Sequence, residues 1–356
     1  MDRTQRLLAG LLAAQLLLLA LFHNPFASRR AAADQPLLPG LASITPEKLE
    51  IDGGQGTSVI LEREGGAWAL GQPKGYPVTP GKVEKVIQDL EHLNVHRQVV
   101  SGSRYHAALK VAPNDFERRV RIWEKPGGNP RAELYVGSSP SYGVSHVRVG
   151  GNDRVYEASG VNSYDLPAEP ASWVERNLVP IANQDVTRFE LANRKGSFAL
   201  EKQGATWTVR SPASRSNTAL DQDKVGDLVR TLGGLALDEP VGPVDERAQG
   251  LTDPEATVLL GRAATKADSA AAQGTPVPAA APAAVTIKIG APVAGKQDQR
   301  YATRSGLGFA VSVGKSVSDR ALDAALADLV KKPAAPPAAR ADSLKSRRPR
   351  PATPHP

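Results

Sequence analysis

Short runs of alternating apolar and polar residues first occur between residues 48 and 70. Three of them, at 48–52, 58–62 and 67–70, are separated by glycine-rich turns. Such alternation is typical of strands that bury one face. Downstream, apolar residues follow the spacing of one helix face, at Val83, Val86, Ile87, Leu90 and Leu93. The pattern therefore predicts a strand meander followed by an amphipathic helix.

The same succession of patterns returns in the second half of the chain. Residues 61–68 (LEREGGAW) reappear as residues 200–207 (LEKQGATW), and a second apolar helix stripe follows. Self-similarity of this kind predicts a structural unit that occurs twice. Because tryptophan buries a large apolar area, we expect both tryptophans in the core, with a carbohydrate or peptide platform as the alternative. The expected core residues are Trp68, Val83, Ile87, Leu90, Trp207, Val225, Val229 and Leu232.

Further strand patterns follow each of the two helices. They lie at 118–123, 133–137, 146–149 and 154–157, and again at 257–260, 286–290, 300–303 and 308–313. Each half is expected to close with a short helix, at 171–178 and at 318–330. One apolar stripe per helix indicates packing on one face of a sheet. The sequence thus predicts an α+β fold of two tandem repeats, each a mainly antiparallel sheet with a helix packed on one face, preceded by one N-terminal transmembrane helix.

Composition divides the chain into five expected parts. They are a cytoplasmic tip with a membrane anchor at 1–27, a linker at 28–43, the first repeat at 44–182, the second repeat at 183–330 and a tail at 331–356. The second repeat contains an Ala- and Pro-rich insertion at 261–284, and the tail is rich in Pro and Arg. Neither composition can bury a core, so both segments are predicted to be disordered.

An apolar run near the N-terminus extends from Leu7 to Phe22 and is interrupted only by Gln15. As a helix it would be about 24 Å long, slightly short of the ~30 Å hydrocarbon core of a bilayer. A cleaved signal peptide is the alternative, but Arg29 and Arg30 precede the small residues that could form a cleavage site. We predict an uncleaved anchor. It is formed by Leu7, Leu8, Leu11, Leu12, Leu16, Leu17, Leu18, Leu19, Leu21 and Phe22.

The net charge and the cysteine content limit the partners and the kinds of site that the chain can have. The formal net charge of +7 indicates affinity for acidic surfaces without selecting nucleic acid, phospholipid or acidic polymer. The basic tail lacks interleaved aromatic residues, so no nucleic-acid partner is expected. Because the chain has no cysteine, it can form neither disulfides nor thiolate-ligated metal sites.

Three partial motifs fall short of catalytic or binding sites. Gly308 and Gly314 precede a Lys-Ser pair, but five residues separate the glycines where a phosphate-binding loop has four. His92 and His96 are four residues apart, whereas a zinc site needs three or four ligands. No Gly-x-Ser-x-Gly element for a nucleophilic serine is present. We therefore predict no catalytic, cofactor-binding or metal-binding residues and no cofactor.

Several packing motifs resemble one known family. They are the Trp68 segment with its helix, Tyr105–Leu109, Leu134–Gly137, His146–Arg148, Gly250–Pro254 and Ile287–Gly290. Over roughly residues 44–330 the chain resembles a family of bacterial envelope proteins known only as the domain of unknown function DUF 4340. In that family a membrane helix precedes a large extracytoplasmic region, and members are often encoded beside components of ABC-type transporters, including those associated with gliding motility.

The resemblance implies a single-pass protein of the bacterial inner membrane with the bulk of its chain in the periplasm. The leading hypothesis is a membrane-anchored, non-enzymatic accessory or scaffold protein whose partners are ABC-type transporter subunits. A periplasmic binding module for a cell-wall or polysaccharide ligand is the alternative, followed by an envelope hydrolase. No small-molecule ligand is expected.

Overall fold

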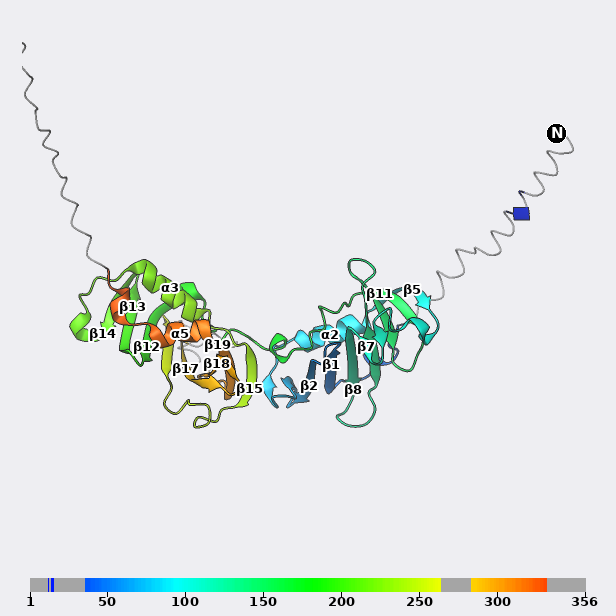
Figure 1. The fold of residues 1–356 in the computed structure, drawn as a ribbon, viewed down its shortest axis with the longest axis horizontal. Coiled ribbons are helices and arrows are strands. Elements are labelled where there is room, and N and C mark those ends of the chain that lie inside the picture. The colour runs from blue at the N-terminus through cyan, green and yellow to red at the C-terminus, as the bar shows by residue number, and fades with distance from the viewer. Residues whose placement is uncertain (1–11, 13, 16–35, 264–282, 332–356) are drawn as a thin grey trace, which may run out of the picture.

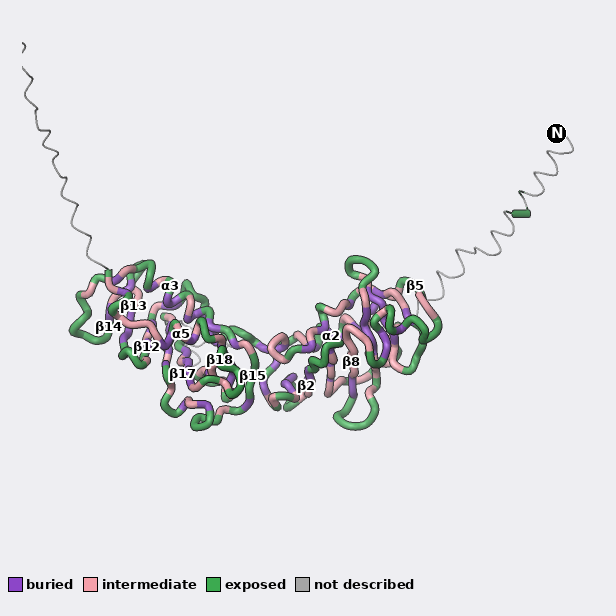
Figure 2. Tube along the Cα trace, viewed as in Figure 1, coloured by how far each residue is buried: buried purple, intermediate pink, exposed green. Residues whose placement is uncertain are grey.

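The computed structural model describes residues 12, 14–15, 36–263 and 283–331. Within this part the chain forms two large sheets, made of antiparallel strands, that lie end to end (Figure 1). Figure 2 shows buried residues running through both sheets and exposed residues concentrated in the loops. The fold therefore has its core along the sheets and most of its exposed surface in the loops.

The first sheet has nine strands in the order β4-β3-β2-β1-β8-β9-β10-β11-β5. Their bounds are β1 (Lys48–Gly53), β2 (Ser58–Glu64), β3 (Ala67–Leu70), β4 (Tyr76–Pro77), β5 (Asn94–Val100), β8 (Arg118–Trp123), β9 (Ala132–Val136), β10 (Val144–Val149) and β11 (Val155–Ser159). A separate hairpin, β6 (Val111–Ala112) and β7 (Asp115–Phe116), packs over the outer face, where Val111 is buried against Tyr135 and Val155.

The second sheet has eight strands in the order β14-β13-β12-β16-β17-β18-β19-β15. Their bounds are β12 (Val186–Asn193), β13 (Gly196–Gln203), β14 (Thr206–Ser211), β15 (Glu239–Pro243), β16 (Ala256–Arg262), β17 (Ala284–Val293), β18 (Lys296–Arg304) and β19 (Phe309–Gly314). Apart from β4, the strands of the two sheets follow each other in the same spatial order.

Alternation along several strands, such as β1 and β12, separates an apolar inner face from a more polar outer face. On β1, Leu49 and Ile51 are fully buried, whereas Glu50 lies on the opposite face with Arg121 of β8. Opposite faces for successive residues follow from the strand's period of two. Three α-helices in the described part add their apolar faces to the inner core. They are α2 (Lys82–Glu91), α3 (Gln222–Gly233) and α5 (Lys315–Asp323).

The predicted α+β class is wrong, because the chain is mainly β. Sheets of nine and eight strands dominate the described part, and its three α-helices have only nine to twelve residues each. The helix expected at 171–178 is a single 3-10 turn, Pro170–Ser172. The helix expected at 318–330 is split into α5 and a 3-10 turn, Leu326–Leu329. Such short helices cover only part of a sheet face, so a helix-packed two-repeat fold does not describe the protein.

The predicted membrane-spanning helix and the localisation that depends on it also require correction. Among the described residues no helix is long and apolar enough to cross a bilayer. This finding overturns the expected single-pass inner-membrane protein with a periplasmic bulk. Of the ten predicted anchor residues only Leu12 is described, and its side chain is 59% exposed. The other nine lie outside the described residues, as do most of the insertion 261–284 and of the tail.

An aromatic contact joins the two sheets. Tyr76 on β4 packs against Phe309 on β19 with ring centroids 5.0 Å apart and ring planes tilted by 53°. Tyr76 is only 2% exposed and belongs to the same core cluster as side chains of the second sheet. Apolar burial of this kind is the main favourable term in holding two surfaces together. We call this contact, with the segments beside it, the junction.

Backbone pairing reinforces the junction. The Leu178 N–H donates to the Leu235 carbonyl at 2.9 Å, and the Leu237 N–H donates to the Arg176 carbonyl at 2.8 Å. Just upstream of residues 176–178, the Trp173 side chain is fully buried and its indole N–H donates to the Pro167 carbonyl at 2.8 Å. These bonds tie the segment between the sheets to the chain that enters β15.

The junction predicts a pH dependence of stability that Tyr76 controls. Burial raises the pKa of Tyr76 to about 12, although the charge of Arg304 partly opposes the shift. Its contribution to stability is therefore complete below the unfolded pKa near 10 and is lost as the pH rises through the folded pKa. In Tyr76→Phe the loss of unfolding free energy between about pH 9 and about pH 11 should be smaller than in the wild type by roughly 1 kcal/mol. Urea unfolding of the wild type and of Tyr76→Phe at both pH values measures these losses, and equal losses in the two proteins would contradict the prediction.

Candidate functional site

The eight predicted core residues all lie in one hydrophobic core cluster. Each has an exposed fraction of 9% or less: Trp68, Val83, Ile87, Leu90, Trp207, Val225, Val229 and Leu232. Trp68 and Trp207 are each 6% exposed. A side chain this deeply buried has almost no surface to offer a ligand, so these residues act through packing.

Each of the two tryptophans has a cation across the neighbouring strand. Trp68 on β3 pairs in register with Arg63 on β2, whose guanidinium carbon lies 5.5 Å from the ring centroid. Trp207 on β14 pairs with Lys202 on β13, whose ammonium lies 6.0 Å from the ring centroid. Cations over an aromatic face are stabilising by about 0.5 to 1 kcal/mol where they are partly exposed. The repeated tryptophan is thus an anchor between strands.

A glutamine side chain caps the free edge of the second sheet at Trp207. The Trp207 N–H donates to Gln222 Oε1 at 2.7 Å, and Gln222 Nε2 donates back to the Trp207 carbonyl at 3.1 Å. The amide therefore replaces a neighbouring strand at the edge strand β14, where unpaired backbone groups would otherwise be open to another chain. Sequence reasoning did not single out Gln222, whose only signal is its place directly after the helix-capping Asp221.

In both sheets a loop backbone crosses a glycine of the sheet, Gly137 directly after β9 and Gly290 inside β17, next to a break in its pairing with β18. A Cβ on Gly137 would lie 2.1 Å from the Leu109 carbonyl oxygen, and one on Gly290 would lie 2.2 Å from the Gln249 carbonyl oxygen. The following residue donates to the same carbonyl in each case, with Ser138 N and Ala291 N each 3.0 Å away. Four of the segments that carry the family resemblance meet at these crossings, Tyr105–Leu109 with Leu134–Gly137 and Gly250–Pro254 with Ile287–Gly290, and their contacts there are packing contacts.

Serine and histidine side chains meet twice in the first sheet. Ser138 Oγ lies 3.1 Å from His146 Nδ1, and His96 Nε2 lies 3.1 Å from Ser159 Oγ. Nucleophilic catalysis needs a base that accepts the serine proton and an acid that orients the base. Ser138 Oγ, however, also donates to the Leu109 carbonyl at 3.2 Å. The acidic neighbour of His146, Glu157, is held by two hydrogen bonds from Arg97.

The acidic groups on the outer face of the first sheet are likewise engaged. Arg121 Nη2 bonds Glu50 at 2.5 Å and Asp52 at 3.1 Å, and Arg119 bonds Asp52 at 2.9 Å. The side chains of Glu50 and Asp52 are only 15% and 14% exposed. Partly buried ion pairs of this kind hold neighbouring strands in register. They leave these carboxylates without the freedom that general acid–base catalysis requires.

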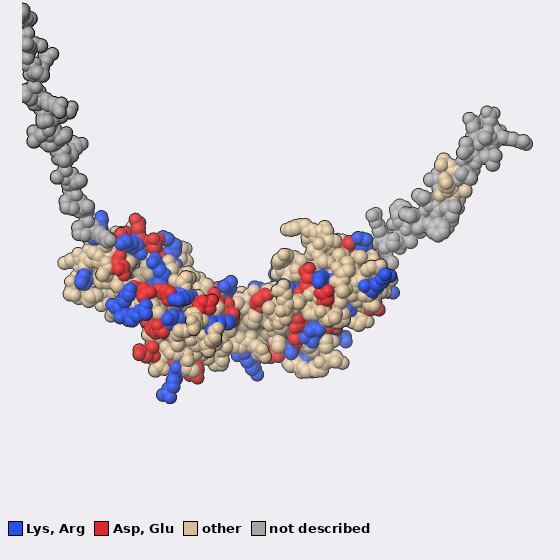
Figure 3. Space-filling model, in the orientation of Figure 1, with Lys and Arg blue, Asp and Glu red and all other residues tan. Residues whose placement is uncertain are grey.

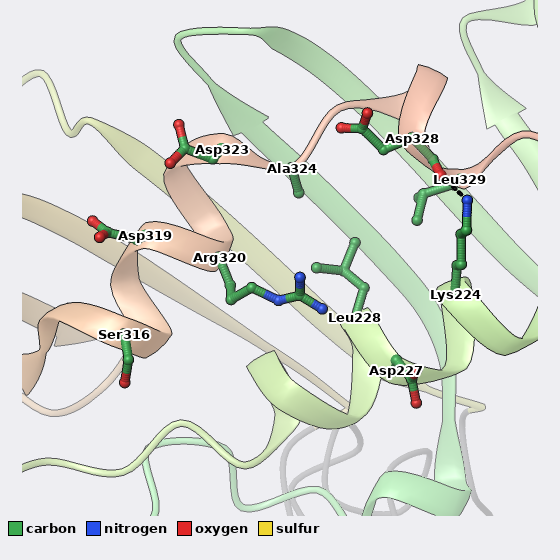
Figure 4. Close-up of a pocket in the computed structure, with 10 residues that line it drawn as sticks. All are labelled: Lys224, Asp227, Leu228, Ser316, Asp319, Arg320, Asp323, Ala324, Asp328 and Leu329. Atoms are coloured by element: carbon green, nitrogen blue, oxygen red, sulfur yellow. Dashed lines mark hydrogen bonds between the residues drawn. The ribbon is translucent and has the colours of Figure 1, made fainter.

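A groove of about 480 Å³ lies between α3, α5 and the 3-10 turn that follows (Figure 4). Leu228, Ala324 and Leu329 give it an apolar floor, and the Arg320 side chain reaches across it toward Leu228. No aromatic side chain lines it.

Most acidic groups around this groove already have partners. Asp319 pairs with Lys315 at 2.8 Å, and Asp227 pairs with Arg230 at 2.8 Å. Asp323 pairs with Arg194, whose hydrogen bond holds the pKa of the Asp323 carboxyl below its usual value. Three of the four aspartates that line the groove are therefore engaged by cations.

The structure also places the histidine pair and the glycine-lysine segment that partly match binding motifs in the sequence. His92 lies at the end of α2 with its Nδ1 2.8 Å from the Gln88 carbonyl oxygen, whereas His96 lies on β5. Among the residues that the structure describes, no group of three His, Asp or Glu could hold a metal ion. The near phosphate loop is strand β19 leading directly into α5, and Lys315 pairs with Asp319 on the same helix.

The two glycines that a loop crosses predict a matched set of substitutions. Gly137→Ala and Gly290→Ala should each lower the free energy of unfolding by about 1 to 3 kcal/mol, because the new methyl group forces a backbone carbonyl to move. Gly226→Ala is the control, since a Cβ there meets nothing within 4 Å. Inside α3 it should raise stability by about 0.5 to 1 kcal/mol. Urea unfolding of the three variants measures the difference, and Gly137→Ala and Gly290→Ala variants as stable as the wild type would refute the packing role.

The two buried tryptophans and their paired cations predict a second set of substitutions. Trp68→Ala and Trp207→Ala should each cost about 3 to 5 kcal/mol, because each removes a large buried ring. Arg63→Ala and Lys202→Ala remove only the cation and should cost about 1 kcal/mol or less. Thermal and urea unfolding compare the four variants. If the tryptophan and cation variants lose stability equally, the tryptophans are not core residues.

Comparison with known proteins places the chain in one family. Residues 68–254 match the family described as "Domain of unknown function (DUF4340)", which is more than half of the chain. The matched region includes both loops that cross the first and second sheets, and it spans the junction segment around Trp173. No curated protein and no solved structure matches the chain.

Proposed function

This chain belongs to the DUF4340 family, and from that premise we propose that it is a non-enzymatic accessory or scaffold protein that binds subunits of an ABC-type transporter. The transporter as partner comes from the family resemblance. The binding role is supported by the form of the molecule.

The observation that carries the proposal is the junction. It joins two sheets into one extended body, and exposed residues lie in the loops of both sheets (Figure 2). A scaffold needs separated surfaces held in a constant relation to each other. A junction in which the buried Tyr76 packs on the partly buried Phe309, with backbone pairing beside it, supplies that relation, because interfaces that are packed like protein cores do not deform continuously.

The alternatives fit the described residues less well. A polysaccharide module needs aromatic rings facing an open site, whereas Trp68 and Trp207 are buried and the groove between α3 and α5 has no aromatic lining. A hydrolase needs a base that an acid orients, whereas Glu157, the acidic neighbour of His146, is held by Arg97, and Ser138 Oγ also donates to the Leu109 carbonyl. On the face seen in Figure 3 acidic and basic side chains are interspersed, which does not favour nucleic acid.

Affinity purification tests the proposal. The full chain, tagged and expressed in its native host, is recovered after mild detergent extraction, and its partners are identified by mass spectrometry. Transporter subunits should co-purify with the full chain and not with a control chain of residues 1–43, which lacks both sheets. Recovery of no transporter subunit, or equal recovery with the control, would show the proposal to be wrong.

A further inference from the structure

Two tyrosines are almost fully exposed at one end of the first sheet. Their exposed fractions are 105% for Tyr142 and 91% for Tyr164. Tyr142 shortly precedes β10, Tyr164 shortly follows β11, and Val144 at the start of β10 pairs with Ser159 at the end of β11. The two loops therefore leave the same end of adjacent strands. These strands lie in the half of the first sheet that is remote from the junction (Figure 1).

The loop that carries Tyr142, Ser138–Gly143, stands on a fixed base. The His146 N–H donates to the Ser138 carbonyl at 3.0 Å, and Ser138 Oγ contacts both the Leu109 carbonyl and His146 Nδ1. His146 and its neighbour Ser145 are 7% and 0% exposed. The tip closes with a bond from the Val144 N–H to the Ser141 carbonyl at 3.1 Å.

The loop that carries Tyr164 is closed by an asparagine and an aspartate. The Tyr164 N–H donates to Asn162 Oδ1 at 2.8 Å, and the Asn162 N–H donates to Asp165 Oδ2 at 3.1 Å. Side chains of this type commonly fix turns by bonding the nearby backbone. Both rings are thus presented on backbone that is already ordered, so binding through them would lose little conformational entropy.

Neither ring has a role in the fold. Within the described residues, the side chains of Tyr142 and Tyr164 take part in no ring contact and no hydrogen bond. Single exposed apolar residues are common on protein surfaces. Here, however, two almost fully exposed tyrosines lie on ordered loops at one end of a sheet. This arrangement is expected of binding anchors, since tyrosine is enriched among the residues that dominate interfaces. We propose that Tyr142 and Tyr164 anchor the surface through which this protein binds its partner subunit; this inference rests on the proposed function.

The chemistry of the first loop indicates the kind of partner. Ser138–Gly143 reads Ser-Ser-Pro-Ser-Tyr-Gly and carries no charge. Tyrosine with serine and glycine is the composition of antibody contact loops, in which a rigid ring supplies area and small polar residues supply adaptable hydrogen bonds. A loop with three hydroxyl-bearing serines is costly to insert into hydrocarbon. The fitting partner is therefore a folded protein surface with shallow apolar depressions and hydrogen-bond acceptors for the phenol hydroxyls.

The test uses the full chain and the purified transporter subunit that it captures, with affinity measured by calorimetry. Tyr142→Ser and Tyr164→Ser should each weaken binding by about tenfold or more, as loss of an interface anchor does. Their melting temperatures should equal that of the wild type, because neither ring packs on the fold. Since no charge is involved at the first loop, raising the salt concentration about tenfold should change the wild-type Kd by less than about threefold.

Tyr105→Ser is the matched control. Tyr105 is 51% exposed and follows β5, whose last residue pairs with the first residue of β11, so it lies at the opposite end of the same sheet. This variant should bind within about twofold of the wild type, because its ring lies outside the anchor surface. If the subunit binds the wild type, Tyr142→Ser and Tyr164→Ser equally, the anchor surface is refuted and the accessory role stands. If the wild type captures no subunit, both are overturned.

Discussion

The packing of the buried Tyr76 ring against Phe309, where the two sheets meet, is the interaction on which the rest of the molecule depends. Each sheet has its own apolar inner face, but Tyr76 and Phe309 connect these faces into one core cluster. The pairing between residues 176–178 and 235–237 then fixes the chain that runs from one sheet to the other. Without this junction the chain would be two separate sheets on a linker, and its surfaces would have no constant relation.

Aromatic residues divide into two classes in this protein, and the division bears on function. Trp68, Trp173 and Trp207 are buried and join strands or segments, whereas Tyr142 and Tyr164 extend from loops into solvent. The tryptophans stabilise the fold, and the exposed tyrosines lie on its surface. A protein with few aromatic residues thus uses its largest rings as internal anchors and places two smaller, amphipathic rings where a partner can reach them.

Much of the strand pattern was predictable, because alternation marks strands that bury one face. The strands around Leu49, Leu61 and Leu134 follow from it directly. Three edge strands were missed for physical reasons. β4 (Tyr76–Pro77) has only two residues and cannot show alternation. β5 (NVHRQVV) is mostly exposed and lacks an apolar face, and β15 (EPVGP) contains two prolines, which only an edge strand accommodates. These omissions, and the over-extended helices at 171–178 and 318–330, produced the wrong fold class.

The candidate site was less predictable than the core. The buried tryptophans and helix stripes could be identified because their spacing reports burial. The exposure of Tyr142 and Tyr164 could not, since a tyrosine in a loop has the same sequence whether it packs or projects. Likewise, the crossing of Gly137 by Leu109 depends on tertiary contacts between distant segments.

The most direct test of the junction is a distance measurement across it. The chain has no cysteine, so a pair introduced at Gln88 on α2 and Asp223 on α3, both exposed, can carry spin labels without background. Pulsed electron paramagnetic resonance then reports the distribution of distances between the two halves. One narrow distribution is the result expected of a single body, whereas a broad distribution with several distances would contradict it.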